Sequence, residues 1–172
     1  AGSAFAQTQN KIGAETPTVT DAEYFKTAFN TIQSLINEGV IVAGHDISEG
    51  GLITALLEMT FANVEGGLEV NLDAIEEKDL VKILFAENPA LLIQVNDAEK
   101  AEAVLSEAGL AFAAIATPCD ERQVMVEKEG QEYQFGIDYL RDMWYKTSYL
   151  LDRKQSGEEQ AKARYANYKK QA

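Results

Sequence analysis

The chain has 172 residues, 46% of them hydrophobic, which is enough for one domain with a substantial core. Its 15 basic and 28 acidic residues give a net charge of −13, which argues against a nucleic-acid partner because phosphates need a basic surface. No apolar run approaches the length of a membrane span, so we expect no membrane partner. The single cysteine, Cys119, excludes an internal disulfide and fits a reducing, cytoplasmic setting.

The N-terminal part of the chain is predicted to be helical on both sides of a polar break. Residues 1–15 are predicted to form a short helix or a helical turn with a thin apolar face, and Pro17 marks the boundary after it. Thr20-Asp21-Ala22-Glu23 is a candidate N-cap box for a second helix that ends near Gly39. The apolar stripe of this second helix is predicted to pack in the core, and it consists of Phe25, Ala28, Phe29, Ile32, Leu35 and Ile36.

A strand, a polar glycine turn and a helix follow one another between residues 40 and 62. The strand is the apolar run 40–43, the turn spans 44–51 with the sequence GHDISEGG, and apolar residues then recur at helical spacing. Such a turn directs N–H groups and the positive end of a helix at one point, which suits a phosphate. Asp46 is placed to hold a magnesium ion beside that phosphate. The alternative is a structural turn in which Asp46 or Ser48 caps the helix.

Strands and helices alternate through the middle of the chain. We expect strands at 68–72, 90–95, 111–116 and 123–127, a short helix at 75–84, and a helix at 98–108 capped by Asn96 or Asp97. The strand at 90–95 is almost continuously apolar, which predicts burial on nearly both faces. Glu129-Gly130 is predicted to turn the chain into 133–135 and complete a hairpin.

The C-terminal part is predicted to be a long helix, 138–153, followed by a polar segment. The inner face of the helix is predicted to comprise Tyr139, Leu140, Met143, Trp144 and Leu151. We expect these aromatic residues to pack in the core or against another domain rather than to stack on a base. Residues 155–172 form a solvated helix or an arm that docks on a neighbouring domain. The order of elements predicts an α+β fold with a mixed sheet and packed helices.

Three segments carry a resemblance to a known family. His45-Asp46-Ile47-Ser48-Glu49-Gly50-Gly51-Leu52, with Leu57-Glu58-Met59 and Phe61-Ala62, resembles the signature of the C-terminal domain of the aminoimidazole ribonucleotide synthetase superfamily. Gly2-Ser3-Ala4-Phe5-Ala6-Gln7 and the segment Trp144 to Arg153 are similar to the ends of this domain in the large single-chain phosphoribosylformylglycinamidine synthases. The resemblance implies a domain at 1–155, folded as a two-layer sandwich of a mixed sheet with helices, and a polar helical arm at 156–172. Because the chain also lacks an initiator methionine, we expect it to be a piece of a longer polypeptide.

The resemblance implies a function in purine biosynthesis. Enzymes of this family convert formylglycinamide ribonucleotide to the amidine with ATP and Mg²⁺, and a separate domain releases ammonia from glutamine. ATP activates the formamide oxygen as an iminophosphate, and ammonia then displaces the phosphate. Carried over to this chain, Asp46 is a magnesium ligand, Ser48 contacts the nucleotide, and Gly50 and Gly51 allow its close approach. Glu49 replaces an aspartate that is common in the family, with the carboxylate kept.

Glu87 and His45 are further candidates with competing interpretations. Phe85-Ala86-Glu87 resembles a motif whose glutamate binds metal in shorter family members, but Asn88-Pro89 departs from that motif. The alternative for Glu87 is a carboxylate at the entrance of a strand. His45 is expected to orient Asp46 or to fill the strand end rather than to act as a general base, and no ligand spacing indicates zinc.

We expect no catalytic residue in this chain, because the phosphate-gripping lysine, the remaining metal carboxylates and the glutaminase cysteine are missing. The isolated chain is therefore predicted to be inactive. Two alternatives stay open: another ATP-dependent enzyme of the superfamily, of the aminoimidazole ribonucleotide synthetase or selenophosphate synthetase type, and a structural module that docks other domains. Whether Asp46 serves the working or an auxiliary nucleotide site also stays open.

Overall fold

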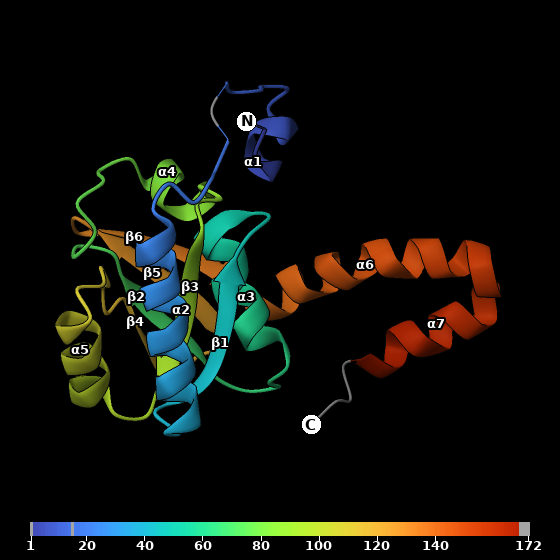
Figure 1. Cartoon of the computed structure of the whole chain (residues 1–172). Coiled ribbons are helices and arrows are strands. Elements are labelled where there is room, and N and C mark those ends of the chain that lie inside the picture. Colours follow the sequence, from blue (N-terminus) through green and yellow to red (C-terminus); the bar gives the residue numbers. More distant parts are fainter. Residues whose placement is uncertain (1, 15, 169–172) are drawn as a thin grey trace. The chain divides into compact units, whose positions relative to one another are not determined.

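The computed structural model describes residues 2–14 and 16–168 (Figure 1). The chain divides into two units. Unit 1 comprises Ala1–Ala55 and Ile75–Ala114, and unit 2 comprises Leu56–Ala74 and Ile115–Ala172. Within the described ranges, no helix has both the length and the apolar character that crossing a membrane requires.

Unit 1 is built on one antiparallel pair of strands, β1 and β3, with helices before and after each strand. The sequence predicts two of its helix starts correctly. Asp21 caps the second helix by accepting the Tyr24 N–H, and Asp97 caps the fifth by accepting the Lys100 N–H. The elements in chain order are α1 (Ala4–Thr8), α2 (Ala22–Asn37), β1 (Ile41–Ile47), α3 (Gly51–Phe61), which begins in this unit, α4 (Leu80–Phe85), β3 (Ala90–Val95) and α5 (Ala98–Glu107).

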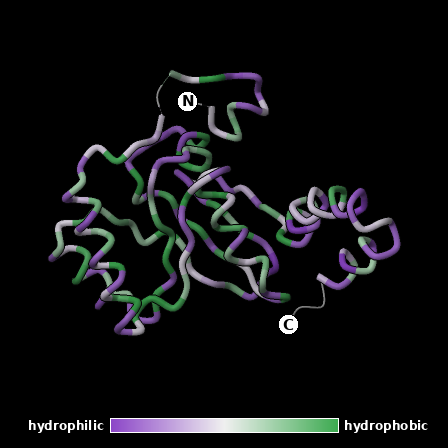
Figure 2. Tube along the Cα trace, turned by 45° about the vertical axis from the view of Figure 1, so that its right-hand side comes forward, coloured by the Kyte–Doolittle hydropathy of each residue, from purple (hydrophilic) through white to green (hydrophobic). Residues whose placement is uncertain are grey.

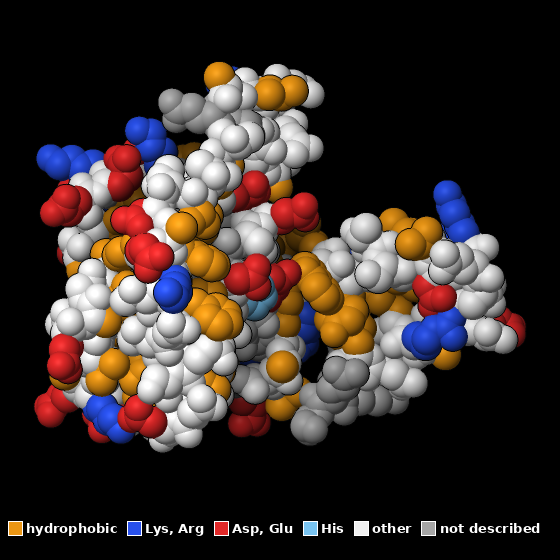
Figure 3. Space-filling model, in the orientation of Figure 1, with side chains coloured by type: hydrophobic (Ala, Val, Ile, Leu, Met, Phe, Trp, Pro, Cys, Tyr) orange, Lys and Arg blue, Asp and Glu red, His pale blue; other side chains and the backbone are white. Residues whose placement is uncertain are grey.

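The core of unit 1 lies where α2, α5 and the start of β1 meet. Its buried members are Leu35, Val40, Ala101, Leu105 and Leu110. The prediction that the whole apolar stripe of α2 is buried is wrong. Phe25 and Phe29 are 53% and 54% exposed, and hydrophobic side chains are visible over this part of the surface (Figure 3). The described part of the chain covers only the side of α2 that carries Leu35.

Strand β3 is also more exposed than its apolar sequence predicts. Within residues 2–14 and 16–168 it pairs only with β1, and Leu91 remains 52% exposed. A continuous apolar run is typical of a central strand covered on both faces, whereas a strand in a two-stranded sheet has an open edge. The predicted burial on nearly both faces is therefore wrong.

Unit 2 contains a mixed sheet of four strands in the order β4-β2-β5-β6. The strands are β2 (Gly67–Asn71), β4 (Ala116–Cys119), β5 (Gln123–Lys128) and β6 (Gln131–Gly136). β2 and β5 run parallel and the other pairs are antiparallel, which confirms the mixed sheet expected from the sequence. The predicted hairpin is also confirmed. Glu129 and Gly130 both have positive φ, as a type I′ turn requires.

Several predicted elements have different bounds in the structure, and two of them lie between residues 75 and 116. The strand expected at 111–116 begins only at Ala116, and the Ala111 N–H donates to the Tyr24 hydroxyl rather than to a neighbouring strand. The helix expected from residue 75 begins at Leu80, because Asp79 accepts the N–H groups of Val81 and Lys82 and so acts as the N-cap.

The C-terminal end of unit 2 is a helical hairpin of α6 (Ile137–Ser156) and α7 (Glu158–Asn167), and much of it is hydrophilic (Figure 2). Tyrosines join the two helices: Tyr145 stacks on Tyr168 and Tyr149 on Tyr165, with ring centroids 4.0 and 4.8 Å apart. The predicted inner face of α6 is wrong, since it includes Tyr139, which is 71% exposed. Of the predicted face, Trp144 does pack, since its ring meets Phe61 edge-on and its N–H donates to Glu58. Tyr145 and Tyr149 are on the side that meets α7.

Candidate functional site

The site begins at the end of β1, which is longer than the sequence predicts. The strand continues through Ile47, so Asp46 lies within it and the predicted turn shrinks to 48–50. Antiparallel pairing sets Asp46 opposite Leu91 and Ile47 opposite Ala90, the first residue of β3. The topology thus brings the segment before β3, which contains Glu87, to the glycine turn.

The two glycines of the turn are required by the chain's own packing. Both have positive φ, +86° at Gly50 and +73° at Gly51. A Cβ at Gly51 would lie 2.6 Å from the Leu84 carbonyl oxygen and 2.7 Å from the Phe85 Cα, closer than real side chains approach. A Cβ at Gly50 would lie 2.3 Å from the Thr54 hydroxyl. The main chain at the end of α4 therefore packs directly on the turn, which only glycine permits.

The N–H groups of the two glycines have acceptors within the chain. Gly50 donates to the Glu87 carboxylate (N–Oε1 2.8 Å), and Gly51 donates to the Ser48 main-chain oxygen at 3.0 Å. Ser48 therefore contributes its carbonyl to the turn. A phosphate at this turn would meet N–H groups that are already engaged in this conformation.

Asp46 presents an open carboxylate beside the only histidine. The side chain of Asp46 is 72% exposed, and its Oδ1 lies 3.8 Å from His45 Nδ1. The same His45 nitrogen is 2.6 Å from the Asp46 main-chain oxygen, and the histidine is visible at the surface beside acidic side chains (Figure 3). Because Mg²⁺ keeps several waters and takes one or two protein carboxylates, an exposed Asp46 fits such an ion. Its role as a metal ligand stays a prediction.

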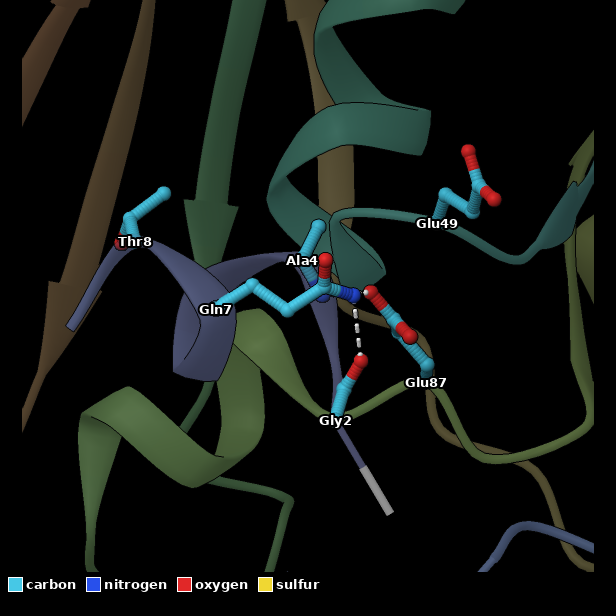
Figure 4. A pocket seen from close by; sticks show the side chains of 6 residues that line it. All are labelled: Gly2, Ala4, Gln7, Thr8, Glu49 and Glu87. Carbon is cyan, nitrogen blue, oxygen red and sulfur yellow. Dashed lines mark hydrogen bonds between the residues drawn. The ribbon is translucent and has the colours of Figure 1, made fainter. Parts of the chain in front are cut away.

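An open pocket of about 500 Å³ lies between α1 and the glycine turn (Figure 4). Of the residues predicted to bind metal or nucleotide, only Glu87 lines it. The Glu87 carboxylate reaches toward Ala4, whereas Glu49 points away (Figure 4). The lining residues are Gly2, Ala4, Gln7, Thr8, Glu49 and Glu87.

The N-terminal segment is the part of this site to which sequence reasoning assigned no role. Gln7 Nε2 donates to the Gly2 carbonyl at 2.7 Å and folds the segment on itself. The signal was present in the sequence, since Gly2-Ser3-Ala4-Phe5-Ala6-Gln7 is one of the segments that carry the resemblance. Spacing alone did not show that this segment meets the glycine turn.

Residues 1–127 match the model of the family described as AIR synthase related protein, C-terminal domain. The chain belongs to this family. It is 35% identical over 159 residues to the probable phosphoribosylformylglycinamidine synthase, chloroplastic/mitochondrial, of Arabidopsis thaliana, and 32% identical over 161 residues to phosphoribosylformylglycinamidine synthase of Homo sapiens. These alignments cover 90% of this chain but only 11% and 12% of the two relatives, so the chain spans about a ninth of their length.

Solved structures show the same fold. The chain is similar to phosphoribosylformylglycinamidine synthase II from Thermotoga maritima, with a TM-score of 0.63 and 19% identity over 72% of this chain and 22% of that one. It is also similar to Thermotoga maritima PurL complexed with ATP, with a TM-score of 0.60 and 18% identity over 67% of this chain and 21% of that one. The likeness confirms the α+β family fold that the sequence resemblance implies.

Proposed function

We propose that this chain is one domain of an ATP- and glutamine-dependent ligase that converts formylglycinamide ribonucleotide to formylglycinamidine ribonucleotide. The observation that carries the proposal is the 35% identity to a probable phosphoribosylformylglycinamidine synthase over 90% of the chain. Support also comes from the fold, which is similar to Thermotoga maritima PurL structures described as complexes with ATP and with FGAR. Because the chain spans about a ninth of its relatives, the remaining parts of the enzyme belong to other domains of a longer polypeptide.

In this proposal residues 1–155 form the family domain and residues 156–172 form an arm toward the next domain. We place the enzyme in the cytoplasm, and the single cysteine, which excludes a disulfide within this chain, fits a reducing compartment. The substrates are formylglycinamide ribonucleotide, ATP and glutamine, with other domains completing the cleft and releasing the ammonia. We expect the isolated chain to be inactive, so that measurable glutamine-dependent ADP formation by the 172 residues alone would contradict this part of the proposal.

The residues of this chain bind and orient rather than transfer protons. Asp46 would hold the Mg²⁺ that offsets the charge of the ATP phosphates, and its exposure leaves room for water and phosphate oxygens in the metal shell. Ser48 is exposed at the turn and would direct its hydroxyl to the nucleotide, with Gly50 and Gly51 beside it. The family resemblance makes Glu87 an alternative metal ligand, but its Oε1 already accepts two main-chain N–H groups, so the magnesium dependence of Glu87→Gln decides between a metal-binding and a structural role.

The test is ADP release by the full-length protein that contains this chain, with formylglycinamide ribonucleotide, glutamine and Mg-ATP. We expect turnover that depends on the ribonucleotide and that is lost in Asp46→Asn at the magnesium concentration that just saturates the wild type. Glu76→Gln, an exposed carboxylate remote in sequence from the turn, is the matched control and should keep wild-type turnover. Absence of ribonucleotide-dependent turnover in the wild type would overturn the proposal.

A second candidate function is a structural domain whose turn does not take part in the reaction. One observation favours it: the N–H groups of Gly50 and Gly51 are satisfied within the chain, and packing alone explains both glycines. This candidate predicts that Asp46→Asn leaves the magnesium dependence of the full-length enzyme unchanged. The ligase proposal predicts that the variant requires more magnesium.

A further inference from the structure

Glu87 joins two segments that are distant in the sequence. One oxygen of its carboxylate, Oε1, accepts the N–H of Ala4 and the N–H of Gly50, each at 2.8 Å. These donors lie 83 and 37 positions away from Glu87. Hydrogen bonds to an ionised carboxylate are about twice as strong as those between neutral groups. A single side chain thus ties the first residue of α1 to the glycine turn.

Phe85, two residues before Glu87, also contacts both α1 and the glycine turn, through its ring and its main chain. Its ring stacks on Phe5 of α1, with centroids 4.4 Å apart and planes at 21°. Its main chain packs against the turn, where a Cβ on Gly51 would come within 2.7 Å of the Phe85 Cα. The segment 84–87 therefore contacts α1 on one side and the turn on the other.

We propose that Glu87 is a positioning residue that couples the N-terminal segment 2–8 to the glycine turn 48–51. The two N–H donors share one acceptor atom, so displacement of segment 2–8 withdraws one donor and leaves the carboxylate free to shift away from Gly50. Segment 2–8 acts as a strap that fixes the turn and the pocket beside it. The value of this coupling for nucleotide binding rests on the proposed function, whereas the coupling itself does not.

Amide hydrogen exchange in the ¹⁵N-labelled 172-residue chain tests the coupling. We expect the amides of Ala4 and Gly50 to be protected in the wild type and to exchange about tenfold faster or more, together, in Glu87→Ala, because both amides lose a hydrogen bond to a charged group. Glu87→Gln keeps an oxygen acceptor of the same shape and should lose only part of the protection. The amides in the core of unit 1, such as that of Leu35, serve as an internal reference. If they exchange at the wild-type rate, the loss of protection at Ala4 and Gly50 is local and does not reflect unfolding of the unit.

Glu49→Gln is the matched control, because this carboxylate lines the same pocket and points away from Glu87 (Figure 4). Both amides should keep their wild-type protection in this variant. Protection of Ala4 that persists in Glu87→Ala while Gly50 alone exchanges faster would overturn the proposal, as would wild-type exchange at both positions.

A second readout in the full-length enzyme separates positioning from metal binding. Glu87→Gln should raise the KM for ATP with little change in kcat and leave the magnesium requirement as in the wild type, in contrast to Asp46→Asn. A magnesium requirement raised as much as in Asp46→Asn would make Glu87 a metal ligand and overturn the proposal. The exchange experiment contains no nucleotide, so it measures the coupling independently of the ligase function and would support or overturn it even if that function is wrong.

Discussion

Arg122 and Asp138 form an ion pair in unit 2, with Arg122 Nε 3.2 Å from Asp138 Oδ1, while the other guanidinium nitrogens of Arg122 bind the chain at the end of α3. Those nitrogens donate to the main-chain oxygens of Thr60, Asn63 and Gly66 at 3.2, 2.6 and 3.1 Å. The last carbonyl groups of a helix lack partners within the helix, and a cation there is also favoured by the helix dipole. Arg122 supplies both the donors and the charge.

Replacing Arg122 should destabilise unit 2 strongly. We expect Arg122→Ala to lower the free energy of unfolding by about 2–3 kcal/mol, because the side chain is largely buried and its carbonyl partners would lose a charged donor. Arg122→Lys keeps the charge, but a lysine cannot reach three oxygens at once. This variant should therefore recover little of the lost free energy of unfolding. Urea denaturation followed by Trp144 fluorescence measures both variants. Arg153→Ala, which breaks an exposed pair with Glu158, should cost less than about 1 kcal/mol.

Two reasons for glycine at position 51, its positive φ and the close packing around it, can be measured separately with Gly51→Ala and a control. A positive φ costs an alanine about 1–2 kcal/mol, and the contacts with Leu84 and Phe85 should add roughly 1–3 kcal/mol of overpacking. Gly39→Ala is the control, because Gly39 has a similar φ of +71° and open space around it. The difference between the two variants in thermal denaturation gives the packing contribution alone. Equal destabilisation would contradict the close contact at Gly51.

The helical hairpin should weaken in acid through one carboxylate. Hydrogen bonds from Arg164, and then from Ser156, hold the pKa of Asp152 below its ordinary value near 3.8. A lowered pKa in the folded state means that the stabilisation is fully present above the ordinary value and is lost as the pH falls through the lowered one. We expect the near-ultraviolet circular dichroism of the stacked tyrosines to decline over this range. In Asp152→Asn the helical hairpin should be less stable at neutral pH. The circular dichroism signal of this variant should change less as the pH falls.

Cys119 should be a slow nucleophile in the folded chain. Burial is the main cause that raises the pKa of its thiol, and the nearby carboxylates of Glu121 and Glu69 raise it further. Only the thiolate reacts with iodoacetamide, so alkylation near neutral pH should be slower in the folded chain than in urea. Equal rates in the two states would contradict this. Glu121→Gln should speed the reaction of the folded chain modestly, because it removes one negative charge.

Local signals predicted two helix starts of unit 1 correctly, those of α2 and α5, but not that of α4. Asp21 and Asp97 cap α2 and α5 because a short carboxylate before an amphipathic run satisfies the first free N–H groups, whatever lies elsewhere. The exposure of Phe25 and Tyr139 was not predictable in the same way. Periodicity shows which side of a helix is apolar, but only the tertiary structure shows whether the chain covers that side.

The same limit applies to the candidate site. The sequence predicted a strand, a glycine turn and a helix around Asp46, and the family signature pointed to the same residues. It did not show that Gly51 is needed because the main chain at Leu84 and Phe85 packs on it. Nor did it show that Glu87 accepts the N–H groups of Ala4 and Gly50, since that contact depends on β3 beginning beside the end of β1.

The aromatic side chains are distributed unequally between the two units. The single tryptophan, Trp144, and six of the seven tyrosines belong to unit 2, and only Tyr24 belongs to unit 1. Intrinsic fluorescence and near-ultraviolet circular dichroism will therefore report the melting of unit 2 and remain almost blind to unit 1. A single smooth unfolding transition measured with these probes would not establish that the whole chain unfolds cooperatively. The ring protons of the only histidine, His45, provide the complementary NMR probe of unit 1.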